Sequence, residues 1–185
     1  MKILYVNAAF RDGSRTAMLA QKVLAEYAND EIIEVALDNR PVAPLDRTGL
    51  AAYNEAVRRG VFEEPMFDAA KRFAEADEIV IAAPFWNYGI PAVLHDYLEL
   101  VCTQGITFDL AESGAYFSKC RAKRLTFVTT AGGFIPENDH AFSYIADLCR
   151  AFWSIPEVRC VKAEGLDIRG ANVGTLLESA YLENA

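Results

Sequence analysis

The sequence predicts an α/β fold with a doubly wound, five-stranded parallel sheet and helices on both faces, in three layers. Five short apolar runs of the kind that parallel sheets bury on both faces recur along the chain. They lie at residues 3–6, 31–37, 78–82, 125–129 and 158–162. Segments with the apolar spacing of amphipathic helices separate them. Because strands alternate with helices, we expect parallel pairing through right-handed crossovers.

The composition suits one compact domain over residues 1–185. The chain is 52% hydrophobic and 24% charged, which allows a sizeable core. A net charge of -8 argues against binding to nucleic acid. No apolar stretch approaches the roughly 20 residues that span a bilayer, and the first residues do not read as a signal peptide, so we expect a cytoplasmic protein without a membrane span. The four cysteines lack metal-binding spacing and are interpreted as reduced thiols.

Six helices are expected around these strands. They begin after residue 16, cover 51–59 and 65–75, start at Pro91, extend around 142–152 and close the chain at 176–182. Pro91 suits a first helical position, where its missing N–H is no loss. Residues 38–49 are expected to form a surface loop. The connection 109–121 is long for a compact domain, and we interpret it as a lid, a subunit contact or a plain surface excursion.

Residues 7–16 form a polar loop between the first strand and the first helix. Ser14 and Thr16 offer hydroxyl donors, and Gly13 lets the backbone turn. The first N–H groups of the helix point outward at the positive end of its dipole, as in an anion site. Arg15 either adds positive charge or points into water. A Ser or Thr before a helix is more often only a cap, and the loop lacks both the Walker lysine pattern and GxGxxG.

Two further loops follow parallel strands. The loop after residue 82 contains Pro84, Phe85, Trp86, Asn87 and Tyr88. Three aromatic side chains around an asparagine favour a wall for a flat ring over simple core filling. The loop after the fourth strand contains Thr130, Ala131, Gly132 and Gly133. Paired glycines let a backbone approach a ligand closely, or else only form a turn.

The three loops meet at one edge of the sheet, because the carboxyl ends of parallel strands share that edge. The first loop suits a phosphate, the second an aromatic ring and the third a close backbone approach. In a flavodoxin-like sheet with strand order 2-1-3-4-5, the switch point lies between the first and third strands, which carry the first two loops. The sequence therefore predicts a site for a phosphorylated planar cofactor.

Several motifs occur in the order found in one enzyme family. They are PFWNYGIP at 84–91, Tyr97-Leu98, GITF at 105–108, TAGG at 130–133 and AEG at 163–165. Over nearly its whole length the chain resembles the FMN-dependent NADH-azoreductase and NAD(P)H quinone oxidoreductase family. The PFWNYGIP block with the downstream GITF is the most specific part of this resemblance.

The resemblance implies roles for the loop residues. Those around the FMN phosphate are Ser14, Arg15 and Thr16. Those against the isoalloxazine and ribityl groups are Phe85, Trp86, Asn87 and Tyr88, preceded by Pro84. Those near the pyrimidine end of the ring are Thr130, Ala131, Gly132 and Gly133. Members of the family are similar in being homodimers with interfacial active sites, so the partner's 109–121 connection would help to cover the flavin.

The resemblance also implies two-electron ping-pong transfer from NADH or NADPH, through FMN, to a quinone, azo or nitroaromatic acceptor. The flavin carries this chemistry, so no catalytic side chain is assigned. Three positions depart from the family. Ala8 stands where many relatives have a Ser on the phosphate, Ala131 where some have Arg, and Leu110 where some have Tyr. A lost hydroxyl contact costs roughly 0.5–1.5 kcal/mol, so Ala8 should weaken FMN binding without abolishing it.

Two alternatives stay open at this point. The first is a flavodoxin-type electron carrier, which would bind FMN but oxidise NADH slowly. The second is a flavodoxin-like interaction domain without a cofactor, which Ala8 and Ala131 would favour. Hydrolysis is poorly supported, because the only histidines, His95 and His140, lie outside any nucleophile motif and are interpreted as surface helix residues. The choice between NADH and NADPH and the physiological acceptor are left open.

Overall fold

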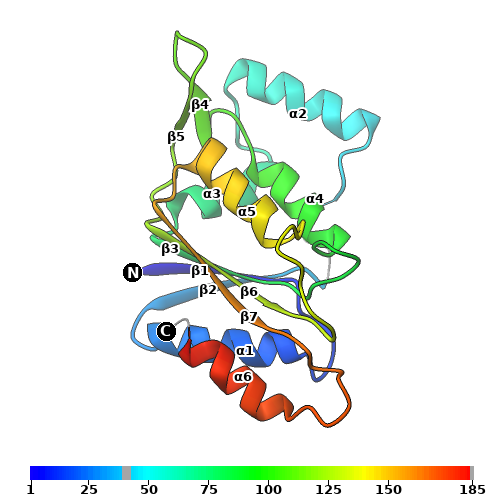
Figure 1. Ribbon diagram of the computed structural model, residues 1–185. Coiled ribbons are helices and arrows are strands. Elements are labelled where there is room, and N and C mark those ends of the chain that lie inside the picture. Colours follow the sequence, from blue (N-terminus) through cyan, green and yellow to red (C-terminus); the bar gives the residue numbers. More distant parts are fainter. Residues whose placement is uncertain (39–42, 184–185) are drawn as a thin grey trace.

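The computed structural model describes residues 1–38 and 43–183, and a five-stranded parallel sheet lies at its centre (Figure 1). Its strands are β1 (Lys2–Asn7), β2 (Glu31–Ala36), β3 (Glu78–Ala82), β6 (Arg124–Thr130) and β7 (Glu157–Ala163). They follow the order β2-β1-β3-β6-β7 and all pair in parallel. The predicted order 2-1-3-4-5 is confirmed, since β4 and β5 lie outside this sheet.

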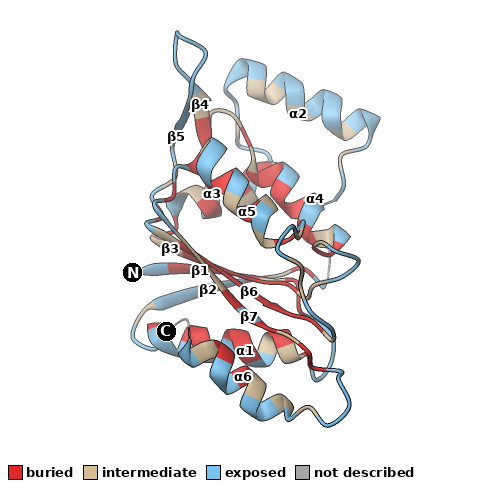
Figure 2. Ribbon diagram, viewed as in Figure 1, coloured by how far each residue is buried: buried red, intermediate tan, exposed pale blue. Residues whose placement is uncertain are grey.

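Helices cover both faces of the sheet, which confirms the three predicted layers (Figure 1). On one face lie α1 (Arg15–Leu24) and α6 (Val173–Leu182). On the other lie α3 (Asp68–Glu75), α4 (Ala92–Val101) and α5 (Phe142–Leu148), with α2 (Arg47–Arg59) at the outside. Figure 2 shows the sheet as the most buried part, whereas α2 contains no buried residue.

Alternate residues of each central strand belong to opposite cores. Ile3 and Tyr5 pack with the core under α1 and α6, while Leu4 and Val6 pack with the core under α3, α4 and α5. All four are at most 2% exposed. A strand buried on both faces has no polar side to show, which explains why the parallel strands are nearly continuous apolar runs in the sequence.

Two helices begin earlier than the sequence analysis expected, because capping side chains set their first turns. Helix α2 begins at Arg47 instead of residue 51, since Asp46 Oδ1 accepts a 2.7 Å hydrogen bond from the N–H of Gly49. The expected loop 38–49 is therefore shorter, and its Pro41 falls among residues 39–42, outside the described part. Helix α6 begins at Val173, where Asn172 Oδ1 accepts from the N–H of Thr175 at 3.1 Å.

Other helix ends also differ from expectation. The segment 65–75 divides into a 3₁₀ turn (Pro65–Phe67) and α3. Pro91 is not the first residue of α4 but its cap, with an extended ψ of 144°. Helix α5 ends at Leu148 and continues as a π-helical turn (Cys149–Trp153). His140 precedes α5, so its expected place within a helix is wrong.

The long connection 109–121 folds into a hairpin that the sequence analysis did not foresee. Strands β4 (Phe108–Leu110) and β5 (Tyr116–Ser118) pair antiparallel. Gly114, with φ of +81°, lies in the turn that joins them. The strands have three residues each, too few for the alternation of a half-buried strand to be recognised. The hairpin projects from the body of the molecule (Figure 1).

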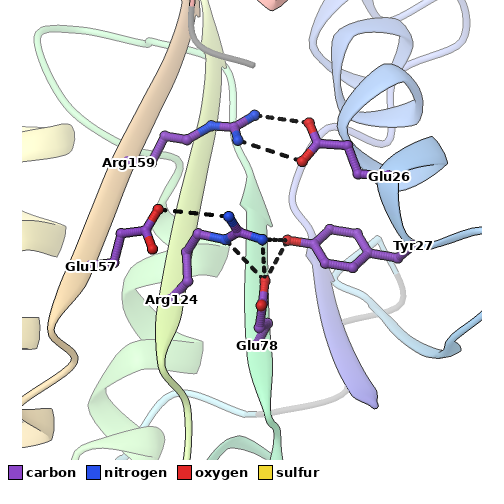
Figure 3. A network of polar contacts seen from close by, with 6 residues as sticks. All are labelled: Glu26, Tyr27, Glu78, Arg124, Glu157 and Arg159. Carbon is purple, nitrogen blue, oxygen red and sulfur yellow. Dashed lines mark hydrogen bonds and ion pairs between the residues drawn. The ribbon is translucent and has the colours of Figure 1, made fainter.

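A polar network joins the amino ends of β3, β6 and β7 to the 3₁₀ turn (Ala25–Tyr27) that follows α1 (Figure 3). Its members are Glu26, Tyr27, Glu78, Arg124, Glu157 and Arg159. Arg124 Nε and Nη2 donate to Glu78 Oε2 at 3.0 and 2.8 Å, and the Tyr27 hydroxyl donates to the same oxygen at 2.6 Å. Burial and the hydrogen bond to Glu78 raise the pKa of Tyr27 to about 12. The network lies at the edge of the sheet opposite the predicted site.

Among the described residues, none of the helices combines the length and the apolar character that crossing a bilayer requires.

Candidate functional site

The carboxyl ends of β1, β3 and β6 and the loop after β7 surround a cavity of about 260 Å³. Nine of the twelve predicted site residues line it. They are Ser14, Arg15, Thr16, Pro84, Phe85, Trp86, Thr130, Ala131 and Gly132. Parallel strands place their carboxyl ends at one edge, so the sheet brings together loops that are more than a hundred residues apart in the sequence.

Asn87, Tyr88 and Gly133 do not line this cavity. Trp86 and Gly89 exchange two backbone hydrogen bonds, of 3.1 and 2.9 Å, around a tight turn. Its central residues, Asn87 and Tyr88, have positive φ values of 50° and 66°. This turn directs both residues outward, where they line a neighbouring open cavity of about 330 Å³ together with His95 and His140.

The left-handed backbone of Tyr88 is unusual for a bulky residue and stores of order 1–3 kcal/mol of strain. Tyr88 is 64% exposed as a residue, and Trp86 is 48% exposed. Strain of this kind persists where surrounding structure imposes it, and it is concentrated at ligand sites. The turn therefore presents aromatic rings at the mouth of the cavity, away from the core.

The N-terminus of α1 faces the cavity. Ser14 caps the helix, since its Oγ accepts from the N–H of Ala17 at 3.3 Å, and Gly13 provides the turn with φ of +65°. The Ser14 hydroxyl hydrogen is not used by this contact and can still be donated to a ligand. Within the described part of the chain, the N–H groups of Arg15 and Thr16 donate to no other residue. The predicted anion site thus has two free backbone donors and one hydroxyl.

Two buried hydroxyls connect this helix to β6. Thr16 Oγ1 and Thr130 Oγ1 are 2.6 Å apart, and both residues are at most 7% exposed. One hydroxyl donates to the other, so one hydrogen of the pair remains available. Arg15 does not point freely into water, because its Nη1 lies 2.6 Å from Asp167 Oδ1.

The loop after β6 is fixed to the loop after β7. The carbonyls of Ala131, Gly132 and Gly133 accept hydrogen bonds from the N–H groups of Leu166, Asp167 and Gly165, respectively. The N–H groups of Gly132 and Gly133 donate to no described residue. A Cβ at Gly132 would lie 2.1 Å from Asp167 Oδ2. The glycine at this position therefore leaves the space in which the Asp167 carboxylate lies, a reason that the sequence analysis did not foresee.

Leu166 and Asp167 line the cavity but were missed. The sequence contained a signal for them, since 163–165 follows the last parallel strand and must end at the same edge as the other three loops. Phe10 and Arg11, which also line the cavity, fall within the predicted loop 7–16 but were not singled out.

Residues 1–181 match the family model of the flavodoxin-like fold. The FMN-dependent NADH:quinone oxidoreductase 2 of Clostridium acetobutylicum is 31% identical over 188 residues, which cover 96% of this chain and 93% of that protein. The chain belongs to the family of flavodoxin-like FMN-dependent NADH:quinone oxidoreductases.

Other members of this family and a solved structure agree. The FMN-dependent NADH:quinone oxidoreductase of Coprothermobacter proteolyticus is 30% identical, over 98% of this chain and 95% of that protein. The crystal structure of an azoreductase from Bacillus anthracis superimposes with a TM-score of 0.80 at 22% identity, covering 99% of this chain and 96% of that chain. The azoreductase shares the fold described above.

Three positions depart from the family, and two of them, Ala8 and Ala131, line the cavity with only a methyl side chain. Ala8 is 1% exposed, and its N–H is occupied by a 2.8 Å hydrogen bond to the carbonyl of Ala82. Ala131 is 6% exposed, and its N–H donates to the carbonyl of Ala163. Neither residue offers a hydrogen-bond donor to a ligand. Leu110 lies in the hairpin and is 43% exposed.

The residues present fit a phosphorylated planar group such as FMN. The α1 end offers hydroxyls, free N–H groups and a guanidinium, as a phosphate requires. Phe85 and Trp86 supply flat apolar walls, and Gly132 supplies a backbone donor. The volume of about 260 Å³ is near the lower end of small-molecule sites, roughly 300–1,000 Å³, so part of a large ligand would extend past the exposed Trp86.

The cysteines take no part in this site. The four thiols are free, and burial raises the pKa of Cys102, Cys120, Cys149 and Cys160 to about 12. A thiol is nucleophilic only as its thiolate, so these groups are inert at neutral pH.

Proposed function

We propose that this protein is an FMN-dependent oxidoreductase that uses NADH or NADPH to reduce quinones, azo compounds or nitroaromatic compounds. The observation that carries the proposal is the cavity at the carboxyl edge of β1 and β3, where anion donors and aromatic walls meet at the switch point of the sheet. Membership of a family of FMN-dependent NADH:quinone oxidoreductases supports it.

We assign the phosphate end of FMN to the start of α1. Arg15 and Thr16 line the cavity, and their free N–H groups lie at the positive end of the helix dipole. The Ser14 hydroxyl adds a donor, and the Arg15 guanidinium adds a charge that can form bidentate hydrogen bonds. Ala8 leaves one side of this end apolar, so we expect moderate affinity.

We assign the ring to the space between the aromatic loop and the loop after β6. Phe85 and Trp86 pack against a flat ring, while the N–H of Gly132 points to its polar edge. Asn87 and Tyr88 line the neighbouring open cavity and would contact only a part of the ligand that extends into it. When bound, FMN supplies two-electron transfer between the nicotinamide and the acceptor. The protein orients both partners and limits water, and no side chain is assigned a proton-transfer role.

The deciding experiment is the visible spectrum of the purified protein, before and after adding FMN, followed by NADH without oxygen and then a quinone. We expect bound flavin, rapid bleaching by NADH and recovery of the spectrum by the quinone. Slow, non-saturating bleaching in stopped flow would indicate an electron carrier of the flavodoxin type. Absence of flavin binding would overturn the proposal in favour of a cofactor-free interaction domain.

We also propose a homodimer with an interfacial active site. The hairpin projects from the body, and Leu110, Tyr116 and Phe117 on it are 43–55% exposed. Helix α2 contains no buried residue. Exposed apolar groups that gather on one projection are typical of protein interfaces. In the dimer, the partner's hairpin would cover the ring beside the exposed Trp86.

Phe117→Lys tests the dimer, because a lysine at this position faces Asp109 across the hairpin. Phe117 makes no ring contact with another described aromatic residue, so the variant should fold. We expect sedimentation velocity to give twice the 20.5 kDa chain mass for the wild type and a shift toward monomer for the variant, with weaker FMN binding. Leu182→Lys, which charges an exposed leucine of α6, is the matched control and should stay dimeric. A monomeric wild type would contradict the proposal.

Finally, we propose that residues 1–185 fold as one domain located in the cytoplasm. One continuous sheet with a core on each face supports the single domain. Four free thiols suit a reducing compartment.

A further inference from the structure

One acidic side chain lies within the cavity that we assign to the anionic cofactor. Asp167, on the loop after β7, lines the cavity, and its Oδ1 lies 2.6 Å from Nη1 of Arg15. The two residues are 152 positions apart in the sequence, and their ion pair joins the start of α1 to the opposite wall of the cavity. A carboxylate beside the proposed phosphate site is unexpected, because like charges repel.

The backbone holds Asp167 in this position. Its N–H donates to the carbonyl of Gly132 at 2.9 Å, and the neighbouring N–H of Leu166 donates to the carbonyl of Ala131 at 3.2 Å. The missing side chain of Gly132 gives the carboxylate the space that it occupies. The side chain of Asp167 is 68% exposed and that of Arg15 is 32% exposed, so the pair is accessible from the mouth.

The guanidinium of Arg15 therefore has two possible anionic partners. A phosphate at the start of α1 needs this cation, and Asp167 already pairs with it. Resting on the proposed function, we propose that Asp167 competes with the FMN phosphate for Arg15 and thereby limits FMN affinity. Binding then requires Arg15 to exchange its carboxylate partner for the phosphate.

This competition acts on the charge of the phosphate and not on the ring. Riboflavin has the same ring and ribityl chain but no phosphate, so its binding gains nothing from Arg15. Loss of the Asp167 charge should therefore strengthen binding of FMN and leave that of riboflavin unchanged. If Asp167 merely obstructed the cavity, both ligands would be affected alike.

The test is Asp167→Asn, with FMN and riboflavin titrated by flavin fluorescence at one fixed ionic strength. We expect the Kd for FMN to fall about 3- to 5-fold, the upper part of the range for a partly exposed charge pair, and that for riboflavin to stay within about twofold. Glu178→Gln is the matched control. It removes one charge from an ion pair with Lys22 of α1, away from the cavity, and should leave both Kd values unchanged.

A second variant examines the exchange itself. Arg15→Gln should weaken FMN binding more in the Asp167→Asn background than in the wild type, because only there is Arg15 released from its competitor. Equal losses in the two backgrounds, or equal tightening of FMN and riboflavin, would overturn the inference. If the wild type binds FMN and Asp167→Asn binds it equally, only this inference fails. If no variant binds FMN, the proposed function fails with it.

Discussion

Gly132→Val is expected to raise the Kd for FMN at least about tenfold while leaving the fold intact. A Cβ at this position would lie 2.1 Å from Asp167 Oδ2 and 2.8 Å from its Cγ, well inside van der Waals contact. The exposed carboxylate must then move, and the branched side chain occupies the wall on which we place the polar edge of the ring. Valine keeps the backbone N–H, but its side chain would hold the ring away from this donor, and a lost hydrogen bond costs roughly 0.5–1.5 kcal/mol. Flavin fluorescence titration measures the change.

Gly174→Val is the control for adding a valine. A Cβ there meets only Asn172 Oδ1, at 3.6 Å, so FMN binding should not change. For riboflavin, whose binding should not depend on the Asp167 charge, adding Asp167→Ala to Gly132→Val removes the clashing carboxylate and should restore part of the affinity. If Gly132→Val binds FMN like the wild type, the ring does not lie against this loop.

The central strands could be predicted because strands buried on both faces consist almost entirely of apolar residues. Strand β3, from Glu78 to Ala82, has four of its five residues buried, and its apolar run carries no competing signal. The first residues of the helices were harder to predict, because a single capping residue decides where a helix begins. Asp46 extends α2 by a full turn, although nothing in the apolar spacing of residues 47–50 indicates it.

The site was predicted where it depends on topology and missed where it depends on local geometry. The loops with Ser14, Phe85 and Thr130 converge because they follow parallel strands. Asn87 and Tyr88 were placed in the cavity, but both adopt positive φ and turn outward. Turns of this kind usually contain glycine at their centre, so an Asn-Tyr pair gives no warning. The ion pair of Arg15 with Asp167 joins loops 152 residues apart, which no local pattern can reveal.

Arg124→Met is expected to lower the free energy of unfolding by about 2–3 kcal/mol without affecting flavin binding. Glu78 is only 14% exposed at its side chain, and Arg124 is its one cationic partner among the described residues (Figure 3). Removing one member of a buried pair leaves the other charge uncompensated, which costs about 3–5 kcal/mol when both are fully buried. Because the Arg124 side chain is 26% exposed, water reduces that cost.

Arg150→Met is the matched control, since Arg150 pairs with Asp147 on the surface of the molecule and both side chains are more than two-thirds exposed. Such pairs contribute about 0–1 kcal/mol, so this variant should unfold close to the wild type. Urea unfolding measures the free energy of unfolding of both variants. The protein concentration is kept the same, because self-association would otherwise shift the midpoint. Equal midpoints for Arg124→Met and Arg150→Met would show that Glu78 and Tyr27 keep each other satisfied without the guanidinium. The network and the cavity lie at opposite ends of the same strands. A loss of stability with unchanged FMN affinity would therefore show that one edge of the sheet stabilises the fold and the other binds the cofactor.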